Sequence, residues 1–97
     1  MRNRFIVSYD ICDDKRLRRV FKTMRGFGEA LQYSVFLCDL SPSERILLLE
    51  KLTPLLNHRE DQVMLVNLGP ADGASGDRIE TLGRALAVPL ERVAVIV

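Results

Sequence analysis

Alternation of apolar and polar residues marks the first predicted element. Residues 4–10 are rich in the β-branched and aromatic side chains that are typical of strands. Alternate side chains of a strand point to opposite faces. One face therefore carries Phe5, Val7 and Tyr9, and the other carries Ile6, Ser8 and Asp10. The pattern predicts a β-strand whose carboxyl end is Asp10.

A helical period replaces this alternation after Asp10. Four apolar residues recur at positions i, i+3, i+4 and i+7, and four basic residues repeat the spacing on the opposite side. The apolar stripe is Leu17, Val20, Phe21 and Met24, and the basic face is Lys15, Arg18, Arg19 and Lys22. Asp13 or Asp14 can cap the start, and Gly26 can end the helix. We predict a helix over about residues 15–25, apolar inside and basic outside.

A second apolar segment, residues 29–40, is long enough for two short strands. We predict a hairpin that turns near Tyr33 and Ser34. A strong helix start follows, with Ser41 as N-cap, Pro42 in the first turn and Glu44 closing a capping box. The apolar positions of this second helix are Ile46, Leu48, Leu49, Leu52, Leu55 and Leu56.

The last 45 residues contain two more predicted strands and several chain breakers. Pro54 should kink or end the second helix near Thr53. Residues 62–68 alternate as a strand, which Gly69 and Pro70 should end. Residues 70–77 have loop composition, and residues 78–86 fit either a short helix or a strand. The final predicted strand, residues 92–97, is apolar on both faces, so it needs cover that a second copy of the chain can provide.

This order of elements is β-α-β-β-α-β with an extra C-terminal strand. It predicts an α+β, ferredoxin-like fold in a single domain over residues 1–97. The apolar last strand, about residues 92–97, is expected to be exchanged with or packed on the partner subunit of a homodimer. The fold supports many unrelated activities, so the function has to be argued from individual residues.

Composition excludes several classes of protein. Of the 97 residues, 47% are hydrophobic and 28% charged, a profile typical of globular proteins and not of disordered ones. No apolar run approaches the roughly 20 residues that span a bilayer, and no export signal is visible, so we expect a cytoplasmic protein. Cys12 and Cys38 lack a C-x-x-C spacing and are interpreted as free thiols.

Charge is distributed unevenly along the chain. The first 25 residues carry eight basic and three acidic side chains, whereas the remainder carries six basic and ten acidic ones. Most of the basic residues are arginines, which suit forked contacts with phosphate. The basic helix face is therefore either a phosphate-binding surface or a solvated face. Tyr9, Tyr33 and Phe36 can stack on bases or pack in the core.

Asp10 is the leading candidate for chemistry, since it ends a strand just before the basic helix. It either caps a turn and faces water or binds a metal ion. A single carboxylate cannot hold a catalytic Mg²⁺, but a two-fold axis beside this strand end would supply a second. His58, the one histidine, lies in a polar turn and is interpreted as a solvated side chain. Gly26 and Gly28 follow a helix instead of opening one, so no nucleotide cofactor is indicated.

Five short motifs occur in an order that is typical of one known family. They are Tyr9-Asp10-Ile11, Asp13-Asp14-Lys15-Arg16, Gln32-Tyr33-Ser34-Val35-Phe36, Leu40-Ser41-Pro42 and Glu60-Asp61-Gln62-Val63. From residue 4 to about residue 68 the chain resembles the small CRISPR-associated ferredoxin-like endonucleases. Members of this family are the smaller of the two core proteins of CRISPR spacer acquisition.

The resemblance implies a homodimer in which Asp10 and its symmetry mate bind Mg²⁺ or Mn²⁺. It implies a metal-dependent endonuclease, a phosphodiester hydrolase acting on single-stranded RNA or double-stranded DNA, that takes part in spacer acquisition with the CRISPR integrase. The expected nucleic-acid-binding residues are Arg16, Arg18, Arg19 and Lys22, and the expected supporting residues are Tyr9, Ser34 and Phe36.

Two further hypotheses stay open at this stage. The chain can be a non-catalytic nucleic-acid-binding scaffold that bridges integrase subunits, in which case Asp10 is dispensable. It can also be a ferredoxin-like regulatory module that binds a small ligand between subunits. The second hypothesis predicts no salt-dependent affinity for nucleic acid, whereas the first requires it.

Overall fold

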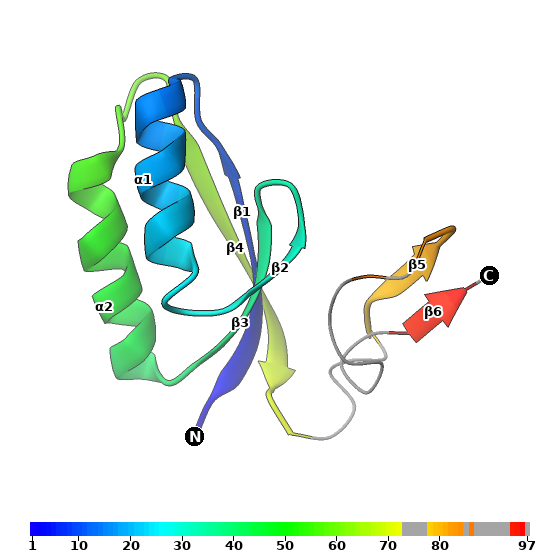
Figure 1. Ribbon diagram of the computed structural model, residues 1–97. Coiled ribbons are helices and arrows are strands. Elements are labelled where there is room, and N and C mark those ends of the chain that lie inside the picture. Colours follow the sequence, from blue (N-terminus) through cyan, green and yellow to red (C-terminus); the bar gives the residue numbers. More distant parts are fainter. Residues whose placement is uncertain (73–77, 85, 87–93, 97) are drawn as a thin grey trace.

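The computed structural model describes residues 1–72, 78–84, 86 and 94–96 (Figure 1). Its elements are β1 (Asn3–Asp10), α1 (Asp14–Met24), β2 (Glu29–Gln32), β3 (Val35–Leu40), α2 (Pro42–Leu52), the 3-10 turn η1 (Thr53–Leu55), β4 (Gln62–Pro70), β5 (Glu80–Leu82) and β6 (Ala94–Ile96). The first six strands and helices follow the predicted β-α-β-β-α-β order.

Strand β1 lies inside a four-stranded antiparallel sheet with the order β2-β3-β1-β4. Val7 of β1 lies opposite Phe36 of β3 on one side and Leu65 of β4 on the other. Both helices cover the same face of this sheet, as Figure 1 shows. The predicted α+β, ferredoxin-like arrangement and the hairpin of β2 and β3 are therefore confirmed.

The core lies between this sheet face and the two helices. The apolar positions of β1 that alternation assigns to one face, Phe5, Val7 and Tyr9, are all buried. They pack against Val20 and Met24 of α1 and Leu48 and Leu52 of α2. Gly28 lets the chain pass close to β3, because a Cβ there would lie 2.2 Å from the carbonyl oxygen of Leu37.

Phe21 departs from the expected apolar stripe of α1. Its side chain is 41% exposed, because Phe21 lies at the edge of the apolar stripe and Val20 and Met24 lie at its centre. The ring still contacts Phe36 edge to face at a centroid distance of 5.6 Å. The guanidinium of Arg25 lies 5.8 Å from the centre of the same ring. Phe21 therefore belongs to the rim of the core.

The predicted helix ends are observed. Asp13 is the N-cap of α1 and accepts a hydrogen bond from the Arg16 backbone N–H. Ser41 and Glu44 form the expected capping box of α2. Helix α2 ends at Leu52, where η1 begins, because Pro54 cannot continue the helical hydrogen bonds.

The end of β4 differs from the prediction. Gly69 and Pro70 were expected to stop this strand, yet β4 continues through Pro70, which lies opposite Asn3 of β1. Strand β4 is the outer strand of the described sheet, and proline is tolerated on an edge strand because its missing N–H is not needed there. Gly69 accommodates the change of direction with a φ of +93°.

The C-terminal part contains a second, parallel pair of strands. Residues 78–86 were expected to form either a short helix or a strand, and they contain the strand β5, which pairs with β6. Ile79 and Leu86 pack on Leu31 and Leu37, on the sheet face that the helices leave open. Of the predicted loop and last strand, residues 73–77, 92, 93 and 97 lie outside the described residues. In the part of the chain that the structure describes, no helix is long and apolar enough to cross a membrane.

Candidate functional site

Asp10 lies exposed at the carboxyl end of β1. Its strand neighbour Tyr9 points into the core, so alternation directs the Asp10 side chain to the sheet face away from the helices. Its register partner on β4 is Gln62. The carboxylate is thus available to a ligand or to a second protein chain on the open face of the sheet.

The open face next to Asp10 carries exposed apolar side chains. Met64 and Val66 of β4 lie opposite Ser8 and Ile6 of β1. The Met64 side chain is 53% exposed and that of Val66 is 41% exposed. Exposed apolar side chains that adjoin one another on a sheet are typical of surfaces that bind another molecule.

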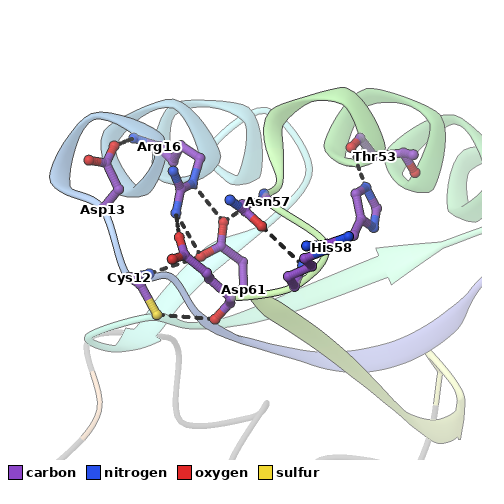
Figure 2. Close-up of polar contacts among 9 residues, drawn as sticks. Cys12, Asp13, Arg16, Thr53, Asn57, His58 and Asp61 are labelled. Carbon is purple, nitrogen blue, oxygen red and sulfur yellow. Dashed lines mark hydrogen bonds and ion pairs between the residues drawn. The ribbon is translucent and has the colours of Figure 1, made fainter.

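The turn that follows Asp10 is fixed by a buried carboxylate, Asp61. Two backbone N–H groups donate to it, from Cys12 at 3.0 Å and from Asn57 at 2.9 Å. Arg16 donates through Nε at 2.7 Å and Nη2 at 3.2 Å, and its Nη2 also reaches Glu60 at 3.1 Å. Figure 2 shows how these groups from the β1–α1 turn, α1 and the α2–β4 loop converge on Asp61.

The charge of this cluster is stable at neutral pH. The Asp61 side chain is completely buried, but hydrogen bonds from Arg16 and from two backbone amides hold the pKa of its carboxyl far below the usual range. The same carboxylate raises the pKa of Arg16. The cluster therefore fixes the backbone two residues after Asp10 and orients this candidate metal ligand indirectly.

Sequence reasoning missed the role of Asp61. The residue occurs in the quoted segment Glu60-Asp61-Gln62-Val63, but 45 residues separate it from Arg16, and nothing local indicates that the two meet. The available signal in the sequence is an acidic pair directly before a predicted strand, in a chain whose first predicted helix is basic. That pattern alone does not distinguish a buried acceptor from a solvated turn.

Arg16 is engaged within the chain, unlike the other predicted phosphate-binding residues. Its guanidinium is shared between Asp61 and Glu60, so its donors are largely used. Arg18, Arg19 and Lys22 are exposed. Within the ranges that the structure describes, they form no ion pair with an acidic side chain. The basic surface of α1 therefore consists of these three residues together with the exposed Lys15, and Arg16 is a structural residue beside it.

The predicted supporting residues lie next to Asp10 but are not free to stack on bases. Tyr9 is 5% exposed and Phe36 is 1% exposed, and the two rings stack on each other at 6.3 Å. Burial raises the pKa of the Tyr9 hydroxyl. Ser34 has a φ of 61° in the hairpin turn and its carbonyl accepts from the Tyr9 N–H at 3.0 Å. The third aromatic residue, Tyr33, is 75% exposed.

The remaining candidate groups have structural partners. His58 is exposed, and its Nε2 lies 2.9 Å from the carbonyl oxygen of Thr53. Both cysteines are free, as expected. Cys12 donates to the Glu60 carbonyl at 3.1 Å, whereas burial raises the pKa of Cys38 to about 12. Over residues 1–72, 78–84, 86 and 94–96 no three acidic, histidine or cysteine residues gather as a metal site.

Comparisons with known proteins give one consistent result. Residues 3–73 match the family described as CRISPR associated protein Cas2. A CRISPR-associated endoribonuclease Cas2 of Rhodospirillum rubrum is 43% identical over 96% of this chain and 89% of its own. Another, of Geobacter sulfurreducens, is 42% identical over the full length of both chains.

Solved structures agree with the sequence matches. The crystal structure of Streptococcus pyogenes Cas2 at pH 6.5 is similar with a TM-score of 0.71 and 32% identity, covering 82% of this chain and 99% of its own. A second crystal structure, described as cas2, has a TM-score of 0.74 and 24% identity, covering 92% of this chain and 95% of its own. This second likeness concerns the fold alone.

Proposed function

Because this chain belongs to the CRISPR-associated protein Cas2 family, we propose that it is a CRISPR-associated endonuclease that hydrolyses phosphodiester bonds in RNA. The observation that carries the proposal is the position of Asp10, exposed at the carboxyl end of β1 just before the basic helix α1. The endoribonuclease relatives support RNA as the substrate. Double-stranded DNA is the other substrate to be tested.

The metal ligands are proposed to come from two copies of the chain. Carboxylate oxygens are the donors that Mg²⁺ and Mn²⁺ prefer, so Asp10 fits such an ion. Among the described residues of one chain, no group of three histidine, cysteine or acidic residues could hold the ion. A homodimer formed through the apolar face of Met64 and Val66, on which Asp10 also lies, would bring two Asp10 carboxylates to one two-fold axis.

Each residue of the site has a separate task in this proposal. The two Asp10 carboxylates hold the ion, which when bound activates water and neutralises charge on the scissile phosphate. Arg18, Arg19 and Lys22 bind the phosphate backbone of the substrate. Asp61 and Arg16 keep the turn after Asp10 in place, so that the carboxylate needs little reorganisation when the ion binds.

The test compares Asp10→Ala with Asp14→Ala, a matched change of an exposed aspartate in the same segment. Labelled single-stranded RNA and double-stranded DNA are incubated with each protein in Mg²⁺, Mn²⁺ or EDTA. We expect cleavage that requires metal, is lost at least 100-fold in Asp10→Ala, and is retained in Asp14→Ala. Equal cleavage by both variants would show that Asp10 is not the metal ligand.

A second candidate function is a non-catalytic scaffold that holds the CRISPR integrase on nucleic acid during spacer acquisition. The exposed basic residues Arg18, Arg19 and Lys22 support it, because they can bind phosphate without any contribution from Asp10. Under this alternative, Asp10→Ala leaves spacer acquisition intact. Charge reversal by Arg18→Glu and Arg19→Glu then abolishes both DNA binding and acquisition.

A further inference from the structure

A small cavity lies between helix α1 and the turn that joins β2 to β3. Its volume is about 270 Å³, and it is lined by Tyr9, Leu17, Arg18, Phe21, Tyr33 and Ser34. We call it the aromatic cup. Three of its six lining residues are aromatic and none is acidic. Tyr9 is 5% exposed, whereas Phe21 and Tyr33 are 41% and 75% exposed.

The aromatic cup adjoins a basic depression on α1. Arg18 and Phe21 line both, and Arg19, Lys22 and Arg25 complete the depression. The guanidinium of Arg25 already lies against the Phe21 ring at 5.8 Å, so this ring accepts a cation as a neighbour. A ligand that fits both surfaces combines a flat apolar part with a negative charge a few ångströms away.

We propose that the aromatic cup holds one unpaired nucleobase of a single-stranded nucleic acid, stacked on Tyr33, while Arg18 and Lys22 bind the adjoining phosphate. This inference rests on the proposed function in that it takes the chain to bind nucleic acid. Nucleobases present flat faces to aromatic rings only when they are unpaired and unstacked. A duplex would meet the basic residues but could not fill the cup.

The size of the cup agrees with this ligand. Pockets for drug-sized molecules measure roughly 300–1,000 Å³, so about 270 Å³ suits a single base and not a longer segment. Tyr9 forms part of the cup and directly precedes Asp10 in β1. The cup therefore lies at the end of β1 that carries Asp10, on the helix side of the sheet, whereas the Asp10 side chain points to the opposite face.

The test measures binding in EDTA, where metal-dependent cleavage cannot interfere. One strand is oligouridine, and the other is an abasic strand with the same number of phosphates. We expect Tyr33→Ala to weaken binding of oligouridine about 10-fold, within the range that stacking contributes per base, and to leave binding of the abasic strand unchanged. The matched variant Tyr33→Phe keeps the ring and should keep wild-type affinity for both.

Arg18→Gln provides the electrostatic control. It should weaken binding of both strands equally and reduce the salt dependence by about one phosphate contact. Equal weakening of both strands by Tyr33→Ala would overturn the proposal, as would no weakening of either. A change in oligomeric state with unchanged binding would also overturn it, because the cup would then be a protein contact.

The result is separable from the nuclease proposal. If wild-type protein binds neither strand in a salt-dependent way, the cup and the nucleic-acid part of the proposed function fail together. If the expected binding pattern is observed while Asp10→Ala cleaves like wild type, the metal site fails and the cup stands.

Discussion

Two arginine–carboxylate pairs of similar geometry lie near the two ends of β1, in different surroundings. Near the amino end, Arg2 donates to Glu44 through two hydrogen bonds of 2.8 and 2.9 Å, and the two side chains are 61% and 35% exposed. Near the carboxyl end, Arg16 donates to Asp61, whose side chain is 0% exposed. Water screens the first pair on both sides, whereas in the second it reaches only Arg16, whose side chain is 24% exposed.

Burial, and not geometry, therefore separates the roles of the two pairs. Glu44 closes the capping box of α2 and can exchange Arg2 for water at little cost. Asp61 cannot exchange Arg16 for water in this way, because its side chain is buried. Its other acceptor positions are filled by the backbone N–H groups of Cys12 and Asn57. The pair beside Asp10 is thus a fixed part of the architecture, while the pair at the opposite end is replaceable.

The largest effect is expected for Asp61→Asn. The amide keeps the shape of the side chain but leaves the Arg16 charge without its partner and presents a donor where backbone N–H groups need an acceptor. The melting temperature should fall by more than about 10 °C, measured by circular dichroism. The same change at the other end of β1, Glu44→Gln, should lower it far less, and equal falls would contradict the comparison.

A smaller effect is expected for Arg16→Lys. Lysine keeps the charge next to Asp61 but cannot form the forked contact of a guanidinium. We expect a fall in melting temperature of about half that of Asp61→Asn, together with reduced cleavage at saturating metal because the turn after Asp10 loosens. Unchanged stability would show that charge alone, without the fork, satisfies Asp61.

As the pH falls, the pair of Arg2 with Glu44 should lose its stabilising effect first, and the pair of Arg16 with Asp61 second. The pKa of Glu44 is lowered from 4.5 to about 2 by its bonds with Arg2 and Ser41, and that of Asp61 is lowered further from 3.8. A carboxyl whose folded pKa is depressed stabilises the protein above its unfolded pKa and loses this contribution as pH falls toward the folded value.

Urea unfolding between pH 5 and pH 2 measures this dependence. The free energy of unfolding should fall steadily below about pH 4.5 in wild type. Asp61→Asn should flatten the decline below pH 3.8, and Glu44→Gln should flatten it from pH 4.5 downward. A decline that neither variant alters would assign the acid sensitivity to other carboxyls.

The smallest effect is expected for Arg2→Gln. The pair with Glu44 is exposed, and exposed pairs contribute little once side-chain ordering and solvent are included. The melting temperature should fall by less than about 4 °C, and 1 M salt should abolish most of the difference from wild type. A fall as large as that of Arg16→Lys would show that burial is not what distinguishes the two pairs.

The local features of the fold could be predicted from the sequence. The alternation around Val7 and the capping box at Ser41 depend on neighbours within a few residues, and both are observed. The position of Asp10 at a strand end follows from the same local pattern. These features are accessible because strand and helix periodicity fixes which side chains share a face.

Features that depend on tertiary contacts could not be predicted. The pairing of Arg16 with Asp61 needs the α2–β4 loop to return beside α1. The exposure of Phe21 depends on how α1 lies on the sheet. The cavity between α1 and the β2–β3 turn likewise forms only when Leu17 and Phe21 of the helix come to lie near Tyr33 of the hairpin.

The contrast between the two cysteines makes the protein convenient for spectroscopy. Cys12 is exposed two residues from Asp10, whereas Cys38 is buried and its pKa is raised to about 12. A maleimide at neutral pH should therefore attach a dye to Cys12 alone, because the thiolate is the reactive form and Cys38 supplies almost none. The native chain then carries one fluorophore per protomer beside the candidate site, and energy transfer between labelled protomers would report their association without any engineered cysteine.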